Sequence, residues 1–360
     1  MSKILCLRPR LPAFEIIISD VETLQEDYLY FNEIGNGNDL CQILLSTFPL
    51  EDICAILFAF KSENKKESEM AKEVEQLFQQ LNIPFYCCSW KSVLVTATFL
   101  ACIAEYGNEE MFEDKIDFIY CLQNGIHIFN LVKCGQFYRI QAETYATLDQ
   151  IYDAKYVNAQ KVFITILKEV PVEDISKQKT TQSMVINALA PTKDLVLINK
   201  SVHDYTTHGI VTIVPHTPNI LNQLYSKYAV LQTSRANYFV IPAHRLSCVT
   251  PHKYKNESLI SITTSEMIHV EKSIICYEEI DNIRFVDDTP HDDLIKLINC
   301  GTFKIGTTIT LKIDKFFMPQ MAVTREHNNL IKNGVIINLE RNTFSIEIIF
   351  DGILFNVTGK

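Results

Sequence analysis

The chain has 360 residues, with an apolar content of 47% and a charged content of 21%, a composition that excludes a disordered chain. Its net charge of -10 and pI of about 5.4 argue against a nucleic-acid-binding face and against a polybasic contact with a membrane. The length is enough for two or three domains.

The ends and apolar runs of the chain give no sign of export or membrane insertion. The N-terminal run is interrupted by charged residues and prolines at Arg8–Pro12, so it does not resemble a signal peptide. The longest apolar run, Ser92–Ala104, is too short for a span of about 20 residues and predicts a buried helix. We therefore expect a cytoplasmic protein.

Two residue counts bear on chemistry. The eleven cysteines include no CxxC pair and fall mostly inside apolar runs, which is typical of reduced core thiols. The eleven glycines are about 3% of the chain against a usual 7%, and they form neither GxGxxG nor GxxxxGK[ST]. Loops that hold phosphate need glycine so that the backbone can approach the ligand.

The N-terminal part alternates short apolar runs with amphipathic segments, an order typical of an α/β sheet. Its clearest helix has apolar residues at helical spacing and a charged opposite face. The expected elements are a strand at Leu11–Asp20, a helix in the later half of Leu24–Leu50, a buried strand at Asp52–Phe60, the clear helix at Lys61–Leu81, a short strand at Phe85–Cys88 and an apolar helix at about Ser92–Tyr106.

The stretch Ile116–Ala142 consists of three apolar runs separated by two turns that contain glycine. Asn124-Gly125 is a strong hairpin signal, because both central positions of a type I′ turn need positive φ. The flanking runs are rich in β-branched and aromatic residues. This stretch therefore predicts a β-meander.

After the meander the pattern stays mixed and then changes. The expected elements are strands near Lys161–Leu167, at Asp194–Ile198 and at Gly209–Val214, a helix or loop at Pro171–Gln182, a turn at Pro215–Pro218, a helix at Asn219–Tyr228 and an apolar segment at Tyr238–Pro242. Strand patterns dominate from about Glu257, and no internal repeat is visible in the sequence. We therefore expect an α/β domain over 1–250 and a β-rich domain over 251–360.

In this order, the elements resemble those of the DnaK-type, seventy-kilodalton heat-shock chaperones. The segment Asp52–Leu81 is similar to the family's strand and helix with the VPAYF motif, and Leu81–Gly107 resembles LNVLRIINEPTAAAIAYG. The meander Asp117–Val132 takes the place of LIFDLGGGTFDVS, and His208–Leu224 resembles HDIVLVGGSTRIPKIQKLL. Ser234–Ser247 takes the place of the family's NPDEAVAYGAA helix.

The resemblance implies an actin-like ATPase core that is truncated at its N-terminus, so that the first phosphate loop and the catalytic lysine are missing. It also implies a sandwich-like, peptide-binding β-domain at the C-terminus. The short C-terminal part is most similar in style to the ribosome-associated Ssz-like branch.

The residues that match the family's nucleotide loops differ from the family's pattern. Where the family has DLGGGT, this chain has Cys121, Leu122, Gln123, Asn124, Gly125 and Ile126. The adenosine-binding GGSTR becomes Val214, Pro215, His216, Thr217 and Pro218, and the switch proline becomes Phe58. Phosphoryl transfer depends on positioning and on charge neutralisation around Mg²⁺, so we expect no catalytic residue, no bound cofactor and a cleft filled by Phe58, Cys121, Ile126 and Pro215.

Other chemistry-bearing groups have simpler interpretations. A metal site could be built from His203, Asp204, His208 and His216, or from His291 with Asp287, Asp288, Asp292 and Asp293, but the spacing is irregular and exposed turns explain both. Cys134 beside Lys133 is a weak candidate for a reactive thiol. We predict no metal. The charged face at Lys61–Glu75 and the edges of the C-terminal strands are candidate partner surfaces.

The sequence therefore predicts a pseudo-ATPase that acts as a co-chaperone or scaffold in protein folding. The resemblance suggests J-protein, nascent or unfolded-chain and ribosome partners, with no nucleic acid and no membrane. One alternative is a working chaperone ATPase that binds ATP and Mg²⁺. Another is an unrelated structural adaptor, which a fold without paired lobes would favour.

Overall fold

The computed structural model divides the chain into two compact units. The first comprises Met1–Arg235, Thr264–Ile268 and Lys315–Met318, and the second comprises Ala236–Thr263, His269–Asp314 and Pro319–Lys360. The structure describes residues 2–10, 13–32, 34–61, 65–107, 111–123, 125–135, 137–152, 156–166, 175–215, 229–231, 237–242, 258–263, 266, 268–276, 279–280, 283–289, 292–298, 303–325, 333–339, 344–350 and 353–357.

The first sheet has the strand order β3-β2-β1-β4-β5. Its strands are β1 (Lys3–Arg10), β2 (Ala13–Asp20), β3 (Glu26–Phe31), β4 (Ile53–Phe60) and β5 (Phe85–Ser89). The first three form an antiparallel meander, and β4 and β5 run parallel to β1. The helices α1 (Gly37–Thr47) and α2 (Lys65–Gln80) pack their apolar residues with those of the sheet in one core cluster. The expected strands at Leu11–Asp20 and Asp52–Phe60 are confirmed within two residues.

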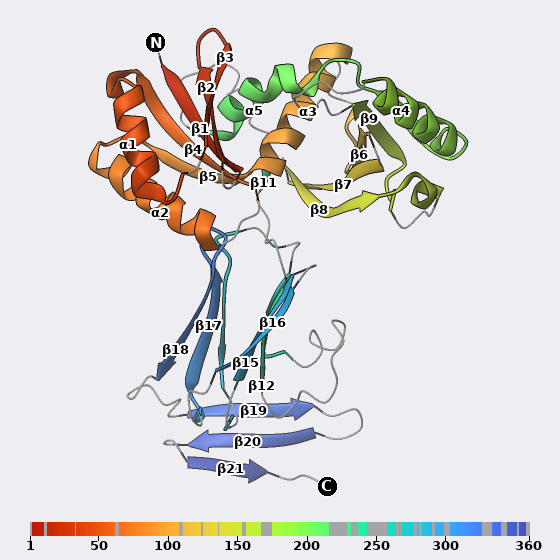
Figure 1. Ribbon diagram of the computed structural model, residues 1–360. Coiled ribbons are helices and arrows are strands. Elements are labelled where there is room, and N and C mark those ends of the chain that lie inside the picture. The colour runs from red at the N-terminus through yellow and green to blue at the C-terminus, as the bar shows by residue number, and fades with distance from the viewer. Residues whose placement is uncertain are drawn as a thin grey trace. The chain divides into compact units, whose positions relative to one another are not determined.

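The second sheet repeats this arrangement (Figure 1). Its order is β10-β9-β6-β7-β8-β11, so β6 stands where β1 stands in the first sheet. The strands are β6 (Lys115–Leu122), β7 (Gly125–Cys134), β8 (Phe137–Ala146), β9 (Lys161–Ile166), β10 (Asp194–Leu197) and the two-residue β11 (Val230–Leu231). The antiparallel meander β6-β7-β8 confirms the prediction for Ile116–Ala142.

Two sheets with one strand order form the two lobes of an actin-like ATPase-type fold, which confirms the expected fold class. The duplication has no counterpart in the sequence, where no repeat is visible. The first lobe has its own leading hairpin, β1–β2, in the position that β6–β7 holds in the second lobe.

Helix α3 (Trp90–Tyr106) begins directly after β5 and leads the chain from the first sheet to the second. Its N-terminus is capped by the Ser89 side chain, which accepts a hydrogen bond from the Ser92 N–H. It ends at Gly107, which has a left-handed φ of 64°. Helix α5 (Thr206–Ile213) follows the short turn η4 (Val202–Tyr205) and lies beside α3 (Figure 1).

The backbones of α3 and α5 come close together at Gly209. A Cβ atom there would lie 3.0 Å from the Val93 carbonyl oxygen and 3.2 Å from the Ala97 nitrogen. On the other side of α5, Ile210 and Val211 are buried in one cluster with Ile4, Cys6 and Ile17 of the first sheet, among others. Glycine is therefore needed so that α5 can fit between α3 and this sheet.

The prediction of a strand at Gly209–Val214 is wrong, because this stretch forms most of α5. Its β-branched residues favour strands locally. A short apolar run that is buried on several sides can form a strand or a helix. Here the run packs against α3 and the first sheet, and it forms a helix. The expected helix at Asn219–Tyr228 lies outside the described residues.

Three more helical elements of the first unit lie among its described residues. They are α4 (Ile175–Leu189) and the turns η1 (Leu50–Asp52) and η3 (Leu148–Tyr152). The segment Lys315–Met318 also belongs to this unit. Its Phe317 is 2% exposed with a left-handed φ of 61°, and packs edge-on against Phe60 with ring centroids 5.2 Å apart. Burial of the ring offsets the cost of this conformation, which is about 1–3 kcal/mol for such residues.

In the residues that the structure describes, the second unit has three small antiparallel sheets, in agreement with the expected β-rich domain. Their orders are β13-β12-β15-β16, β14-β17-β18 and β19-β20-β21. The strands are β12 (Asn237–Pro242), β13 (Ile260–Ile262), β14 (Glu271–Ile275), β15 (Ile283–Thr289), β16 (Asp292–Ile298), β17 (Thr307–Ile313), β18 (Pro319–Arg325), β19 (Asn333–Leu339), β20 (Phe344–Phe350) and β21 (Ile353–Val357). Strand β12 lies within Ser234–Ser247, where the resemblance implied a helix.

Replacing Gly209 tests the contact between α3 and α5. On helix propensity alone, Gly209→Ala would stabilise the chain by about 1 kcal/mol. Because the new Cβ meets backbone atoms of α3, we expect a loss of stability instead, and a loss of at least about 2 kcal/mol for Gly209→Val. The single tryptophan, Trp90, reports urea unfolding of this unit. Ser183→Val, at an exposed position of α4, controls for a β-branched residue in a helix, and equal effects at 183 and 209 would contradict the close packing.

Candidate functional site

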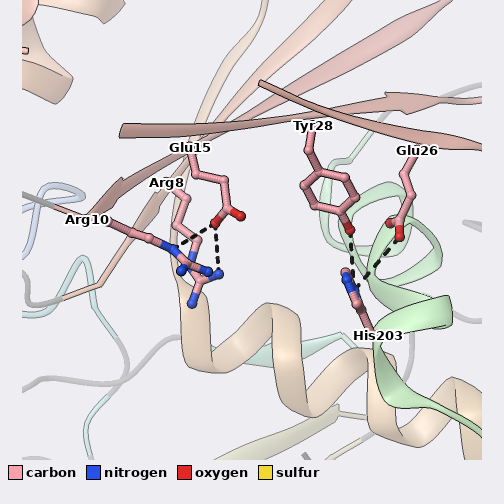
Figure 2. A network of polar contacts seen from close by, with 6 residues as sticks. All are labelled: Arg8, Arg10, Glu15, Glu26, Tyr28 and His203. Atoms are coloured by element: carbon pink, nitrogen blue, oxygen red, sulfur yellow. Dashed lines mark hydrogen bonds and ion pairs between the residues drawn. The ribbon is translucent and has the colours of Figure 1, made fainter. Parts of the chain in front are cut away.

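The β1–β2 hairpin has a cluster of charged side chains on one face (Figure 2). Arg8 lies opposite Glu15 in the strand register. Glu15 is 2% exposed, and its Oε2 accepts hydrogen bonds from Arg8 Nη1 at 2.9 Å and from Arg10 Nε at 3.0 Å. One buried carboxylate therefore holds two guanidinium groups.

The charges in this hairpin do not cancel. Two arginines share one carboxylate, which leaves an excess positive charge in a protein of net charge -10. Burial lowers the pKa of Arg8, and the neighbouring charge of Arg10 lowers it further, although Glu15 acts in the opposite direction. The Arg8 guanidinium carbon lies 3.8 Å from the centroid of the Trp90 ring, so the excess charge is partly stabilised by a cation–π contact.

The first turn of α3 connects this cluster to the second lobe. Lys91, next to Trp90, forms an ion pair with Glu143 of β8. The other oxygen of Glu143 lies 2.8 Å from Nε2 of His127 on β7. The His127 ring stacks on Tyr145 with centroids 3.8 Å apart and an angle of 16° between the rings. Glu143 is therefore held from two sides.

We call the pairs Arg8–Glu15 and Lys91–Glu143, together with Trp90 between them, the ionic bridge. It joins the leading hairpin of the first lobe to the meander of the second through the start of α3. Both carboxylates already have cationic partners within the chain. Their negative charge is already compensated by these cations, so neither carboxylate of the ionic bridge is a free anionic ligand for a metal ion.

The structure places the residues that match the second phosphate loop at the tip of β6–β7. Cys121 and Ile126 are paired across the hairpin, and both are buried in a cluster with Val185 and Leu189 of α4. Burial raises the pKa of the Cys121 thiol to about 12. Gly125 has a φ of 155°, and a Cβ there would lie 2.8 Å from the carbonyl oxygen of Ala146. These residues therefore form part of the apolar core and a tight strand contact.

The other matched residues do not gather around this tip. Gln123 is an exposed turn residue, and Pro215 directly follows the end of α5. Asn124, His216 and Thr217 lie outside the described residues. Phe58 lies in a different core cluster, on the first sheet, where it contacts Phe14 and Phe60. The expectation that Phe58, Cys121 and Ile126 fill one cleft is therefore wrong, because two separate cores contain them.

A second polar group joins β3 to the start of α5 (Figure 2). The Tyr28 hydroxyl lies 3.3 Å from His203 Nδ1, which is also 3.8 Å from Glu26 Oε1. The Thr207 hydroxyl donates to Glu26 Oε2 at 3.0 Å. Burial lowers the pKa of the nearby His208, while the charge of Glu26 opposes this shift. These contacts fix η4 and α5 on the first sheet.

The alternative sites considered from the sequence can be placed in part. Among the residues that the structure describes, no group of three or more His, Cys, Asp or Glu side chains is arranged to hold a metal ion. His203 instead contacts Tyr28 and Glu26, and His291 lies outside the described ranges. Cys134 is half-buried at the end of β7. In the same described part of the chain, no helix is long and apolar enough to cross a membrane.

The ionic bridge was not identified from the sequence. Arg8, Pro9 and Arg10 suggested a break in an apolar run, and β1 was not predicted. The sequence signal that could have identified it is a pair of opposite charges that face each other across two strands. In a tight hairpin between residues 10 and 13, Arg8 falls opposite Glu15. Glu143, His127 and Lys91 lie on three different elements, so no local spacing connects them.

Comparisons with known proteins find only distant structural likenesses. No protein-family model and no curated protein matches the chain. A Bacteroides thetaiotaomicron protein, described as having an actin-like ATPase fold and unknown function, is 10% identical over 58% of this chain and 95% of its own, with a TM-score of 0.32. An ROK family protein from Streptococcus pneumoniae, in complex with sucrose, is 8% identical over 58% of this chain and 97% of its own, with a TM-score of 0.36.

The Ppx/GppA phosphatase of Aquifex aeolicus is 8% identical over 59% of this chain and 99% of its own, with a TM-score of 0.32. These TM-scores are below 0.5, so the likenesses carry no argument about function. The fold assignment rests on the repeated strand order.

Replacing Glu15 by glutamine tests the hairpin half of the ionic bridge. The amide cannot compensate the charges of Arg8 and Arg10, so we expect Glu15→Gln to lower the free energy of unfolding by about 2 kcal/mol. Glu22→Gln, at an exposed position after β2, should change it by less than about 0.5 kcal/mol. Urea unfolding followed by Trp90 fluorescence measures both. A loss at position 15 no larger than that at 22 would show that the cluster does not contribute to stability.

Glu143 gives the ionic bridge a pH dependence. Burial raises its pKa, but the His127 hydrogen bond and the Lys91 charge outweigh burial, so the pKa lies below its ordinary value. A lowered pKa in the folded state gives a stabilisation that is complete above the unfolded-state pKa of about 4.3 and is lost as the pH falls through the folded-state value. Wild type should therefore lose more stability than Glu143→Gln between about pH 5 and pH 3. Glu51→Gln is the exposed control, and parallel profiles for wild type and Glu143→Gln would exclude this contribution.

Proposed function

We propose that this chain is a non-catalytic protein on an actin-like fold, which acts through its surfaces as a co-chaperone or scaffold and does not bind or hydrolyse ATP. The observation that carries the proposal is the chemistry of the two leading hairpins. In the first, the charged groups bind one another. In the second, the pair Cys121 and Ile126 next to the tip is buried in the apolar core.

The first argument concerns the metal. Phosphoryl transfer from ATP requires Mg²⁺ held by oxygen ligands next to the phosphates. Glu15 and Glu143 are the carboxylates of the ionic bridge, and each accepts hydrogen bonds from two basic groups. Freeing either one would leave a cation without its partner in a partly buried place, which costs several kcal/mol. This supports a site without a catalytic metal.

The second argument concerns the phosphates. A hairpin that cradles phosphate presents backbone N–H groups from a glycine-rich loop. At the tip of β6–β7, Gly125 is in close contact with the carbonyl of Ala146, and Cys121 and Ile126 face the core. No side chain of this pair can donate a strong hydrogen bond to an anion. This supports the proposal that the second lobe has no phosphate-binding loop.

The chaperone part of the proposal has a different basis. It rests on the sequence resemblance to heat-shock chaperones, together with a second unit that consists of antiparallel sheets. Strands at sheet edges can accept an extended peptide by forming main-chain hydrogen bonds. J-proteins and unfolded chains are the partners that this proposal implies. The adaptor alternative required a fold without paired lobes, so the two matching sheets remove its support.

Nucleotide titration separates the proposed pseudo-ATPase from a working ATPase. Calorimetry with Mg-ATP and Mg-ADP should show no binding heat up to about 1 mM nucleotide, and the melting temperature should not rise. A known actin-like ATPase provides the positive control. A saturable rise in melting temperature that requires Mg²⁺ would overturn the non-catalytic assignment.

A second assay tests the chaperone part independently of nucleotide. The full chain should slow the aggregation of a chemically unfolded protein by the same amount with and without ATP. Pull-down with purified J-protein and with ribosomes then tests the proposed partners. The chaperone role would be rejected if the chain neither slows aggregation nor binds a J-protein or ribosomes. If it also binds no nucleotide, the proposed loss of ATP binding still stands.

A further inference from the structure

Helix α5 carries two buried polar atoms that make no hydrogen bond. In the part of the chain that the structure describes, neither Nδ1 of His208 nor the hydroxyl oxygen of Thr212 has a partner. The two residues are four positions apart, so they lie one above the other on the same face of the helix. A buried polar group without a hydrogen bond lowers stability. Helix α5 therefore holds its place at a cost.

This cost falls on the most closely packed helix contact of the first unit. Between the two residues lies Gly209, where the backbone of α5 meets the backbones of Val93 and Ala97 of α3. On another side the helix buries apolar residues against the first sheet. Elements that move in a regulated way come from the less stable parts of a structure. The unsatisfied groups on α5 therefore indicate a helix that can leave its docked position.

The neutral and the charged ring of His208 differ at the buried atom. A neutral ring can keep its single hydrogen on Nε2 and leave a lone pair on Nδ1, whereas a charged ring carries a hydrogen on both nitrogens. In the docked helix this second hydrogen would be buried without an acceptor. Charging the ring therefore raises the cost of docking, and a released helix would avoid it by exposing the ring to water.

The acidic residues near α5 compensate this charge only in part. Glu26 of β3 is the carboxylate whose field favours a charged His208. Its Oε2 already accepts the Thr207 hydroxyl at 3.0 Å, and its Oε1 lies 3.8 Å from Nδ1 of His203. Asp204 of η4 is exposed to solvent, where its field is screened. Burial outweighs Glu26, so the pKa of His208 lies below its ordinary value.

The other elements packed against α5 do not add a counter-ion. The ring of Tyr205 in η4 lies 5.0 Å from the histidine ring, and its hydroxyl accepts a hydrogen bond from the cation Lys200 at 3.1 Å. On α3, Lys91 belongs to the ionic bridge, and Glu105 accepts hydrogen bonds from the backbone of residues 199 and 200. In the first sheet, burial raises the pKa of the Cys6 thiol, which stays neutral.

We propose that His208 makes α5 an acid-sensitive latch, in which charging the ring releases the helix from α3 and from the first sheet. The released state binds the proton more tightly, because there the ring is in water. Docking is therefore fully stable above the ordinary histidine pKa of about 6.5 and weakens as the pH falls below it. The fit of the first lobe against α3 would then depend on pH.

Trp90 reports on the latch, because it packs against the same cluster as the buried residues of α5. Its fluorescence in the full chain, titrated from about pH 7.5 to about pH 5, should show a step with a midpoint below about 6.5. His208→Gln cannot take up a proton there, so the step should be absent. His203→Gln is the matched control. It removes the contacts with Tyr28 and Glu26 but keeps His208, and should keep the step.

Two variants that retain the imidazole test the latch should His208→Gln fail to fold. Thr212→Val keeps the branched shape and removes the unpartnered hydroxyl, so docking should strengthen. We expect a higher urea midpoint and a step at lower pH. Gly209→Ala crowds the contact with α3, so its step should lie at higher pH than that of the wild type.

Hydrogen exchange locates the change. At about pH 5.5, after correction for intrinsic rates, the amides of residues 206–213 should lose at least about tenfold of their protection, while those of α2 keep theirs. A wild type without a fluorescence step would overturn the proposal. So would a step that His208→Gln leaves at the same midpoint, a Thr212→Val step at higher pH, or an equal loss in α2, because the whole unit would then unfold.

Discussion

The close approach of α3 and α5 at Gly209 is the contact on which the first unit depends. Each of the two sheets must bury its inner face, so the first unit needs helices that pack between them. Helix α3 is the link between the sheets, and α5 fits beside it only because Gly209 has no side chain to meet Val93 and Ala97. Ile210 and Val211 then cover the inner face of the first sheet. In an interior packed this closely, even the volume of one added methyl group is felt. The polar contacts of Glu26, Tyr28 and His203 join β3 to the turn η4, which directly precedes this helix.

The ionic bridge follows from this arrangement. Because α3 starts at the end of β5, its first residues Trp90 and Lys91 lie where both lobes can contact them. Arg8 reaches Trp90 from the first lobe, and Glu143 reaches Lys91 from the second. Such pairs add little net stability when exposed, but breaking one that is partly buried leaves a charge without compensation. The ionic bridge therefore contributes little net stability, and its main effect is to restrict which other groups can bind at this position.

The sequence predicted the parts of this fold in which local pattern and tertiary role agree. The apolar runs around Asn124-Gly125 specified the β6–β7 hairpin, although Gly125 pairs with Leu122 as the first residue of β7 and is not a central turn position. The helical spacing within Lys61–Leu81 specified α2. It failed where packing overrides local preference. Gly209–Val214 has a β-branched composition but is helical, because α3 and the first sheet enclose it. Strand β1 was missed because Pro9 falls inside it, and proline is tolerated there because the pairing of β1 with β4 ends at Leu7. The site was not predictable because its members come from separate elements and converge only when both lobes have formed.

The duplication of the strand order shows why the fold does not decide the function. The hairpins β1–β2 and β6–β7 hold equivalent places. Counted back from the hairpin tips, the pair Arg8–Glu15 of the first matches the pair Tyr120–His127 of the second. Equivalent positions in the backbone therefore hold an ion pair in one lobe and two aromatic rings in the other. A fold supplies positions, and the side chains at those positions determine what can bind. The frame therefore holds an ion pair in one lobe where it holds two rings in the other, and these side chains, not the strand order, decide what each hairpin can contact.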